Sequence, residues 1–120
     1  MALASRPDFA ECHFNLGGIY ARQGQLDSAV EAFKRAIQIR PGFTEAQYNL
    51  GTVYARQGRW ESAILQYNKT VSLQPEHVKA YRGLAAVYQQ KGMEKEAREA
   101  SETATRLESG SNRNRVPNKQ

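Results

Sequence analysis

Few side chains in this 120-residue sequence have the spacing that catalysis or metal binding requires. The two histidines, His13 and His77, occupy different kinds of position, one in a packing slot and the other in a loop, and they lack the spacing of metal ligands. The single cysteine, Cys12, excludes an internal disulfide and a cysteine-rich zinc site. The sequence contains no glycine-rich phosphate loop, nucleophile elbow or pair of catalytic carboxylates. We therefore expect a protein that is not an enzyme and that holds no metal or cofactor.

The side chains best suited to binding are two asparagines. Asn15 and Asn49 lie 34 positions apart, and each precedes a glycine, Gly17 or Gly51, by two residues. A side-chain amide both donates and accepts hydrogen bonds, so two such groups along one wall could bind the backbone of an extended peptide with little regard to its sequence. The alternative is that both are only solvated surface residues, and the third equivalent position, Gly83, has no amide.

The spacing of 34 residues is not confined to the asparagines. It relates five further sets of three residues: Leu16, Leu50 and Leu84; Tyr20, Tyr54 and Tyr88; Gly24, Gly58 and Gly92; Ala29, Ala63 and Ala97; and Pro7, Pro41 and Pro75. A fixed period of about 20 to 50 residues indicates supersecondary units that stack side by side and present an extended curved surface. The repeat therefore predicts a binding module.

Within each unit, apolar residues recur at helical spacing rather than in alternation. In the first unit, Leu16, Ile19 and Tyr20 indicate one helix, and Val30 with Phe33 indicates a second. A glycine lies between the two helices, because glycine adopts the positive φ of a helix C-terminus without strain, and a proline ends the second helix. Each unit is thus predicted to be a helical hairpin, in which the small residue after each repeated leucine lets a neighbouring helix approach closely.

This pattern resembles the tetratricopeptide repeat, whose 34-residue signature runs W-x2-L-G-x2-Y, then A-x3-F, then P. The first two units carry nearly all of it: Leu16, Gly17, Tyr20, Ala29, Phe33 and Pro41, and then Leu50, Gly51, Tyr54, Ala63, Tyr67 and Pro75. The tryptophan slot is degenerate and holds His13, Gln47 and Tyr81. The resemblance implies an all-α fold, a right-handed superhelix of three helical hairpins (an α-solenoid), with repeats at about 10–43, 44–77 and 78–108.

The third unit departs from the pattern on one face. Where the second unit has apolar residues, the third has polar ones: Glu94, Arg98, Ser101 and Thr105 in place of Trp60, Ile64, Tyr67 and Val71. A terminal repeat needs a polar outer face for solubility, so we expect a helix at about 94–108 to cap the array. Residues 109–120 lack apolar periodicity and are predicted to form a disordered basic tail.

Residues 1–9 resemble the last turn of another second helix, since Pro7 aligns with Pro41 and Leu3 with Ile37. The segment is either a short lead-in or the remnant of a preceding repeat in a longer array, and we favour the remnant. In that case the first helix presents an apolar edge that a neighbouring copy could cover. Self-association through this N-terminal edge is therefore expected.

The formal charge of +5 comes mainly from the tail, where Arg113, Arg115 and Lys119 contribute +3 without an acid. The rest of the chain is nearly balanced, so charge is a weak argument for a nucleic-acid partner. The sequence has neither a signal peptide nor a run of about 18 apolar residues. We expect a cytoplasmic protein without a membrane partner, with a nuclear location also allowed.

In superhelices of this family, the first helix of each hairpin lines the concave groove, and the second helices, with Gln66 among them, are expected on the convex side. The groove-facing positions are the candidate partner-binding residues: Glu11, Phe14, Asn15, Arg22, Glu45, Tyr48, Asn49, Thr52, Arg56, Lys79 and Arg82. The pair Asn15 and Asn49 resembles the asparagine ladder in the peptide-binding groove of the O-linked N-acetylglucosamine transferase repeats.

Two other features of the groove set its expected chemistry. Phe14 and Tyr48 are either contact residues for a partner, since aromatic side chains are enriched at interface hot spots, or packing residues between repeats. The basic side chains Arg56, Lys79 and Arg82 favour an acidic segment of the partner in the C-terminal half of the groove.

The family's carboxylate clamp, which grips chaperone C-termini ending in Glu-Glu-Val-Asp, is not expected here. Asn49 and Lys79 match the clamp. Phe14 and Gly18, however, stand where it needs lysine and asparagine, and Gly83 stands where it needs arginine.

The leading interpretation is therefore a protein–protein interaction scaffold that binds a partner's segment in the concave groove. One alternative is a nucleic-acid-associated module that uses the tail and the basic groove residues Arg22, Arg56, Lys79 and Arg82. The strict period of 34 residues argues against this alternative, because helical-hairpin RNA readers usually repeat at nearly 35. A second alternative is a structural array that self-associates through its N-terminal edge.

Overall fold

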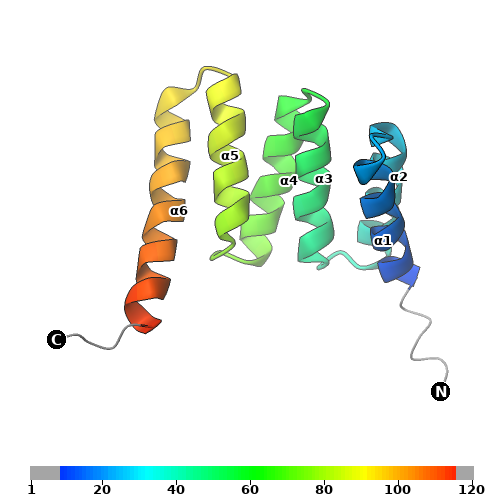
Figure 1. Ribbon diagram of the computed structural model, residues 1–120, viewed down its shortest axis with the longest axis horizontal. Coiled ribbons are helices and arrows are strands. Elements are labelled where there is room, and N and C mark those ends of the chain that lie inside the picture. Colours follow the sequence, from blue (N-terminus) through cyan, green and yellow to red (C-terminus); the bar gives the residue numbers. More distant parts are fainter. Residues whose placement is uncertain (1–8, 116–120) are drawn as a thin grey trace.

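Six α-helices alternate with short turns between residues 9 and 115, the part of the chain that the computed structural model describes (Figure 1). They are α1 (Phe9–Arg22), α2 (Leu26–Ile39), α3 (Thr44–Arg56), α4 (Trp60–Leu73), α5 (Val78–Gln90) and α6 (Glu94–Arg115). No β-strand occurs within this range. Of the lead-in expected at residues 1–9, Phe9 belongs to α1. Residues 1–8 and the end of the tail at residues 116–120 lie outside the described residues.

The three turns inside the hairpins have one backbone conformation. Gly24 has a φ of 79°, and Gly58 and Gly92 have 75° and 77°. In the first turn the N–H of Gln25 donates to the carbonyl of Tyr20 at 2.9 Å, and the same bond recurs in the other two turns. This is the hydrogen bond that closes a helix followed by a glycine in the left-handed conformation. The helix-ending role that the sequence predicts for these glycines is therefore confirmed.

Prolines set the ends of the second helices. The helix α2 ends at Ile39, two residues before Pro41, and α4 ends at Leu73, two residues before Pro75. Proline has no N–H to donate and disfavours helical backbone in the residue before it, so the helix stops just short of it.

The helix α6 is longer than the sequence predicted. Residues 109–115 were expected to belong to a disordered tail, yet α6 continues to Arg115. Its end obeys the rule of the other two second helices, because Arg115 lies two residues before Pro117. The serines, glycine and asparagines of this stretch are poor helix formers, but none of them terminates a helix as proline does.

The helices pack as three antiparallel pairs that stand side by side, with α1 and α2 at one end of the row and α5 and α6 at the other (Figure 1). Within the row, α3 contacts both α1 and α5, so the first helices of the hairpins form one continuous wall. A buried cluster that includes Phe33, Leu50, Tyr67 and Val87 runs between the pairs. The prediction of an all-α solenoid of three hairpins is confirmed.

Close helix contacts occur at the small residues that follow the repeated leucines. A Cβ on Gly17 would lie 2.8 Å from the ring of Phe33, and one on Gly51 would lie 2.9 Å from the ring of Tyr67. Both distances are too short for real carbon atoms, so these positions need glycine for space. Gln66 was expected on the convex side, and this prediction is wrong, because the residue is only 9 % exposed. A Cβ on Gly51 would lie 3.3 Å from the Cβ of Gln66, so Gln66 packs into the contact between α3 and α4.

Candidate partner-binding groove

A hollow of about 200 Å³ opens in the wall of first helices between α1 and α3. Its lining residues are Gly18 and Ala21 from α1, Phe33 from α2, and Asn49, Thr52, Val53 and Arg56 from α3. Phe33 is almost fully buried and reaches the hollow from the helix behind the wall, so its ring forms the floor. The hollow thus combines an apolar base with an amide, a hydroxyl and a guanidinium at its margin.

Three of the predicted groove residues meet at this hollow: Asn49, Thr52 and Arg56. The guanidinium of Arg56 donates from Nη1 to the carbonyl oxygen of Ala21 at 3.1 Å. That carbonyl lies in the last turn of α1, where the helix dipole is negative. Arg56 therefore ties the first two hairpins together as well as lining the groove.

Asn15 and Asn49 have different surroundings, although they are equivalent in the repeat. Asn49 is half-buried at the hollow, whereas Asn15 is exposed on α1, as are Glu11 and Arg22. The guanidinium of Arg22 lies near the hollow, 3.8 Å from where a Cβ of Gly18 would stand. The two amides therefore differ in burial, and only that of Asn49 lies at the hollow.

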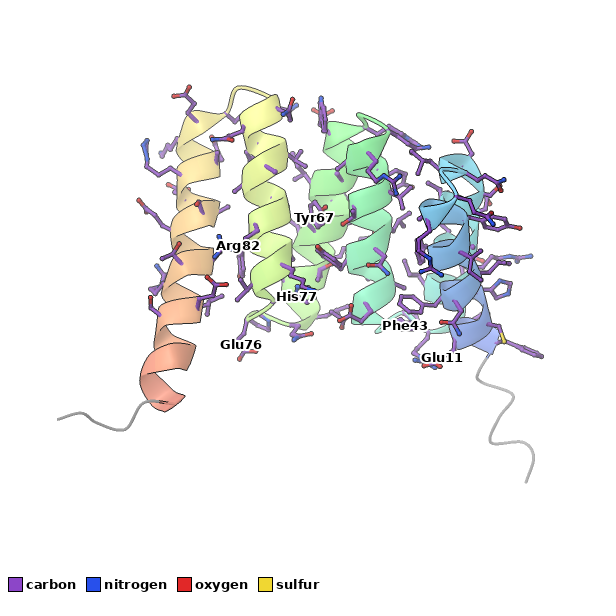
Figure 2. The ribbon with its side chains drawn as sticks, viewed as in Figure 1. Glu11, Phe43, Tyr67, Glu76, His77 and Arg82 are labelled. Carbon is purple, nitrogen blue, oxygen red and sulfur yellow. The ribbon has the colours of Figure 1, made fainter. Side chains whose placement is uncertain are left out.

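The aromatic candidates pack between repeats, which was the alternative to partner contact. Two clusters of three rings lie one repeat apart: Phe14, Phe33 and Phe43, and then Tyr48, Tyr67 and His77. The ring centroid of Phe14 lies 4.8 Å from that of Phe43, and the centroid of Tyr48 lies 5.1 Å from that of His77. Figure 2 shows Phe43 and His77 both near the lower edge of the row, where α3 and α5 begin. Phe14 and Tyr48 thus order the loops that lead into α3 and α5.

His77, expected to lie in a loop, caps α5. Its Nδ1 accepts the N–H of Ala80 at 3.1 Å, which is the bond that an N-cap side chain makes. The opposite nitrogen, Nε2, lies 3.9 Å from a carboxylate oxygen of Glu45. Glu45 therefore faces the end of α5. The position of His77 directly before the first helical residue was the signal that could have revealed this role.

The basic residues of the third unit do not form a bare positive stripe. Arg82 forms an ion pair with Glu108 on α6, and in Figure 2 it lies on the side of α5 that faces that helix. Lys79 is exposed in the first turn of α5. With Arg56 on a carbonyl and Arg82 on a carboxylate, the arrangement gives no particular support to the nucleic-acid alternative.

The wall is built differently between α3 and α5. The ring of Tyr67 lies where Gly83 approaches, and a Cβ at position 83 would be only 2.6 Å from its Cζ. The Tyr67 hydroxyl lies 2.9 Å from the hydroxyl of Thr52, and either can donate. Burial raises the pKa of Tyr67 above its ordinary value, while the hydrogen bond with Thr52 opposes that rise. The amide missing at Gly83 thus has a steric cause.

Two properties of the described residues bear on other functions. Their histidine, cysteine and acidic side chains form no group of three or more that could hold a metal ion. None of the described helices is both long and apolar enough to span a membrane.

Known proteins with the same repeat are similar to this chain in sequence and in structure. The family described as TPR repeat matches residues 17–58 and 51–92. A crystal structure of MamA superimposes with a TM-score of 0.85 at 31 % identity, covering 87 % of this chain and 61 % of MamA. The chain thus spans about three fifths of the MamA chain. No curated protein matches the sequence significantly.

Two solved structures with bound peptide share the fold. The first TPR of Spaghetti (RPAP3), bound to the HSP90 peptide SRMEEVD, has a TM-score of 0.81 at 24 % identity, with 83 % of this chain and 79 % of that chain covered. The second TPR of the same protein, bound to the same peptide, has a TM-score of 0.82 at 19 % identity, with 89 % and 99 % covered.

Proposed function

Because this chain belongs to the tetratricopeptide-repeat family, we propose that it is a protein-interaction module whose concave groove binds an extended segment of a partner protein. The observation that carries the proposal is the hollow between α1 and α3, with Phe33 as its floor and Asn49 at its margin. The peptide complexes of the two RPAP3 domains support it as examples of the same fold that hold a peptide.

The chemistry of the hollow indicates what the segment carries. An apolar side chain would contact the ring of Phe33, and the amide of Asn49 would pair with the neighbouring peptide group. The guanidinium groups of Arg22 and Arg56 flank the hollow, so an acidic residue beside the apolar one would be favoured. Fully burying a side chain of the size of valine or leucine contributes about 1.5–3 kcal/mol.

A chaperone C-terminus is not the segment that we propose. The position where the carboxylate clamp needs a lysine holds Phe14, whose ring packs on Phe43 and Phe33. The position where it needs an arginine holds Gly83, where the ring of Tyr67 leaves no space for a side chain. A ligand selected by this groove would thus be read mainly by the hollow rather than by its terminal carboxylate.

A variant in which a side chain fills the hollow tests the proposal. Peptides selected from a random phage-displayed library on the parent protein would be measured by calorimetry against Gly18→Leu, whose side chain projects into the hollow. We expect loss of binding with full helicity, because Gly18 has open space around it except for Arg22. The double variant Asn15→Ala with Asn49→Ala should bind about tenfold to a hundredfold more weakly, since an unpaired amide costs about 1–3 kcal/mol.

The matched control is Asn68→Ala, an exposed asparagine on α4. It should bind the selected peptides like the parent. If Gly18→Leu and the double variant also bind them like the parent, the concave groove is not the binding surface and the proposal is wrong.

A further inference from the structure

The helix α1 exposes apolar side chains at positions that α3 and α5 bury. Leu16 is 40 % exposed, whereas its counterparts Leu50 and Leu84 are 2 % and 4 % exposed. Ile19 is 42 % exposed, and its counterparts on α3 and α5 are each 2 % exposed. The surface around Leu16 and Ile19, here called the N-terminal edge, is therefore an inter-repeat contact surface that no other helix between residues 9 and 115 covers as its equivalents are covered.

The edge is hollowed rather than flat. A groove of about 360 Å³ runs between α1 and α2, and its lining residues are His13, Leu16, Tyr20, Ser28, Glu31, Ala32 and Arg35. On the next hairpin the matching surface is occupied, because α2 packs against α3 there, as α4 packs against α5. The chain thus contains two examples of the helix that fits such a surface.

Those two helices share an apolar pattern. Their core-facing residues stand at positions n, n+4, n+7 and n+11: Leu26, Val30, Phe33 and Ile37 on α2, and Trp60, Ile64, Tyr67 and Val71 on α4. All eight belong to the core cluster or pack against it. A helix with this spacing is what the N-terminal edge is shaped to receive.

A polar contact fixes the register of both helices. The amide of Gln57 donates to a carboxylate oxygen of Asp27 at 2.8 Å. One repeat later, at the same two positions, Lys91 pairs with Glu61. In each case the acid directly follows the first apolar residue, at n+1. The residue of the N-terminal edge equivalent to Gln57 and Lys91 is Gln23, which is exposed at the end of α1.

We propose that the N-terminal edge docks an amphipathic helix of a partner protein, with apolar residues at n, n+4, n+7 and n+11 and an acid at n+1. The docked helix continues the two interfaces already present in the chain and leaves the concave groove open. This binding is separate from the groove function and does not depend on it.

A second copy of this chain does not supply that helix through its C-terminal end. The equivalent positions of α6 hold Glu94, Arg98, Ser101 and Thr105, and Lys95 stands at n+1 in place of the acid. Charged residues in an apolar contact would be desolvated without partners. At n+1, Lys95 would offer Gln23 an ammonium group in place of the carboxylate that Gln57 and Lys91 contact. Head-to-tail stacking, the simplest form of the self-association expected from the sequence, is thus disfavoured.

The chain provides its own probe. A synthetic peptide of residues 25–40, which carries the α2 pattern, would be titrated into the isotope-labelled full chain and followed by NMR. We expect saturable shifts at Leu16, Ile19 and Gln23, at least tenfold weaker for the peptide with Val30→Asp or Asp27→Lys. The protein variant Leu16→Asp should lose the response, and Leu65→Asp, at an exposed leucine of α4, should keep it.

A fusion protein provides a second test, which is needed if the isolated peptide binds too weakly to detect. Residues 10–43 duplicated ahead of Phe9 should raise the melting temperature of the full chain, and the same fusion with aspartate at the added counterparts of Val30 and Phe33 should not. The proposal would be overturned if the peptide caused no shifts and the fusion did not raise the melting temperature. Peptide shifts confined to α3 would also overturn it.

Two other occupants of the edge are outcomes of the same experiments. If the parent dimerises in sedimentation and Leu16→Asp makes it monomeric, a second copy covers the edge and the proposal is wrong. If the peptide binds only after residues 1–8 are deleted, this chain's own N-terminal segment is the occupant and the proposal fails equally.

Discussion

The two intervals of the inner wall, α1–α3 and α3–α5, are built on equivalent positions with different outcomes. In the first, Phe33 lies behind Gly18 and Asn49, and a hollow remains above its ring. In the second, Tyr67 occupies the same repeat position, with its hydroxyl on Thr52 and its ring against Gly83. The second interval thus differs at three equivalent positions, with Thr52 for Gly18, Tyr67 for Phe33 and Gly83 for Asn49, and its tyrosine contacts both of the other two.

The largest expected effect comes from making the second interval like the first. Gly83→Asn restores the asparagine of the repeat, but its Cβ would meet the Tyr67 ring at 2.6 Å. We expect the free energy of unfolding in urea to fall by about 1–3 kcal/mol, the usual cost of overpacking. Gly18→Asn, where the only neighbour is the end of Arg22 at 3.8 Å, is the control and should be close to neutral. Equal effects of the two changes would contradict the steric account.

A smaller effect is expected when the second interval loses its hydroxyl. Tyr67→Phe removes the 2.9 Å hydrogen bond to Thr52 and leaves the ring in place. The expected loss of unfolding free energy is about 0.5–1.5 kcal/mol, the net value of a typical hydrogen bond. Thr52 keeps its bond to the carbonyl of Tyr48 at 3.2 Å, so its hydroxyl is not left unpaired. An unchanged urea midpoint would show that the hydroxyl contact contributes nothing to closing this interval.

The same tyrosine makes the second interval sensitive to alkali. Because burial raises the pKa of Tyr67, the unfolded chain loses this proton at a lower pH than the folded chain does. The stabilisation is fully present below the unfolded pKa, about 10, and is lost as the pH rises through the folded value. Stability curves of the parent and Tyr67→Phe between about pH 8 and pH 11 should therefore converge at the alkaline end. Parallel curves would contradict the inferred pKa shift.

The smallest effect concerns the contacts that hold neighbouring hairpins in register. Lys91 lowers the pKa of Glu61 through its hydrogen bond and its charge. A lowered pKa gives stability that is present above the unfolded value and is lost as the pH falls. Lys91→Gln reproduces the Gln57–Asp27 contact of the first interval, so its melting temperature should fall less than that of the parent between about pH 6 and pH 3. The pair is exposed, and the difference should be small.

The sequence alone predicted those parts of the molecule that depend on local chemistry. Glycine at a left-handed position and proline after a helix act within a few residues, so Gly24 and Pro41 located the turns correctly. The composition of residues 109–115 predicts disorder, yet α6 continues to Arg115, two residues before Pro117, because no residue of this stretch terminates a helix as proline does.

The groove was predicted only in outline, because its floor comes from a different helix. The repeat placed Asn49, Thr52 and Arg56 on one face, and they do meet at the hollow. It could not show that Phe33 would reach between α1 and α3, or that Phe14 would turn toward Phe43. Those outcomes depend on side-chain directions across three helices, which the spacing along one helix does not determine.

The length of α6 has a consequence for how the chain opens. It has 22 residues, against 14 in each of α2 and α4, so about two turns run beyond the end of α5 (Figure 1). A helix segment without tertiary packing is only marginally stable in water. The amide protons of these last turns should therefore exchange with solvent long before those of α3 and α4. Unfolding by fraying would start from the C-terminal end of α6 and reach the wall last.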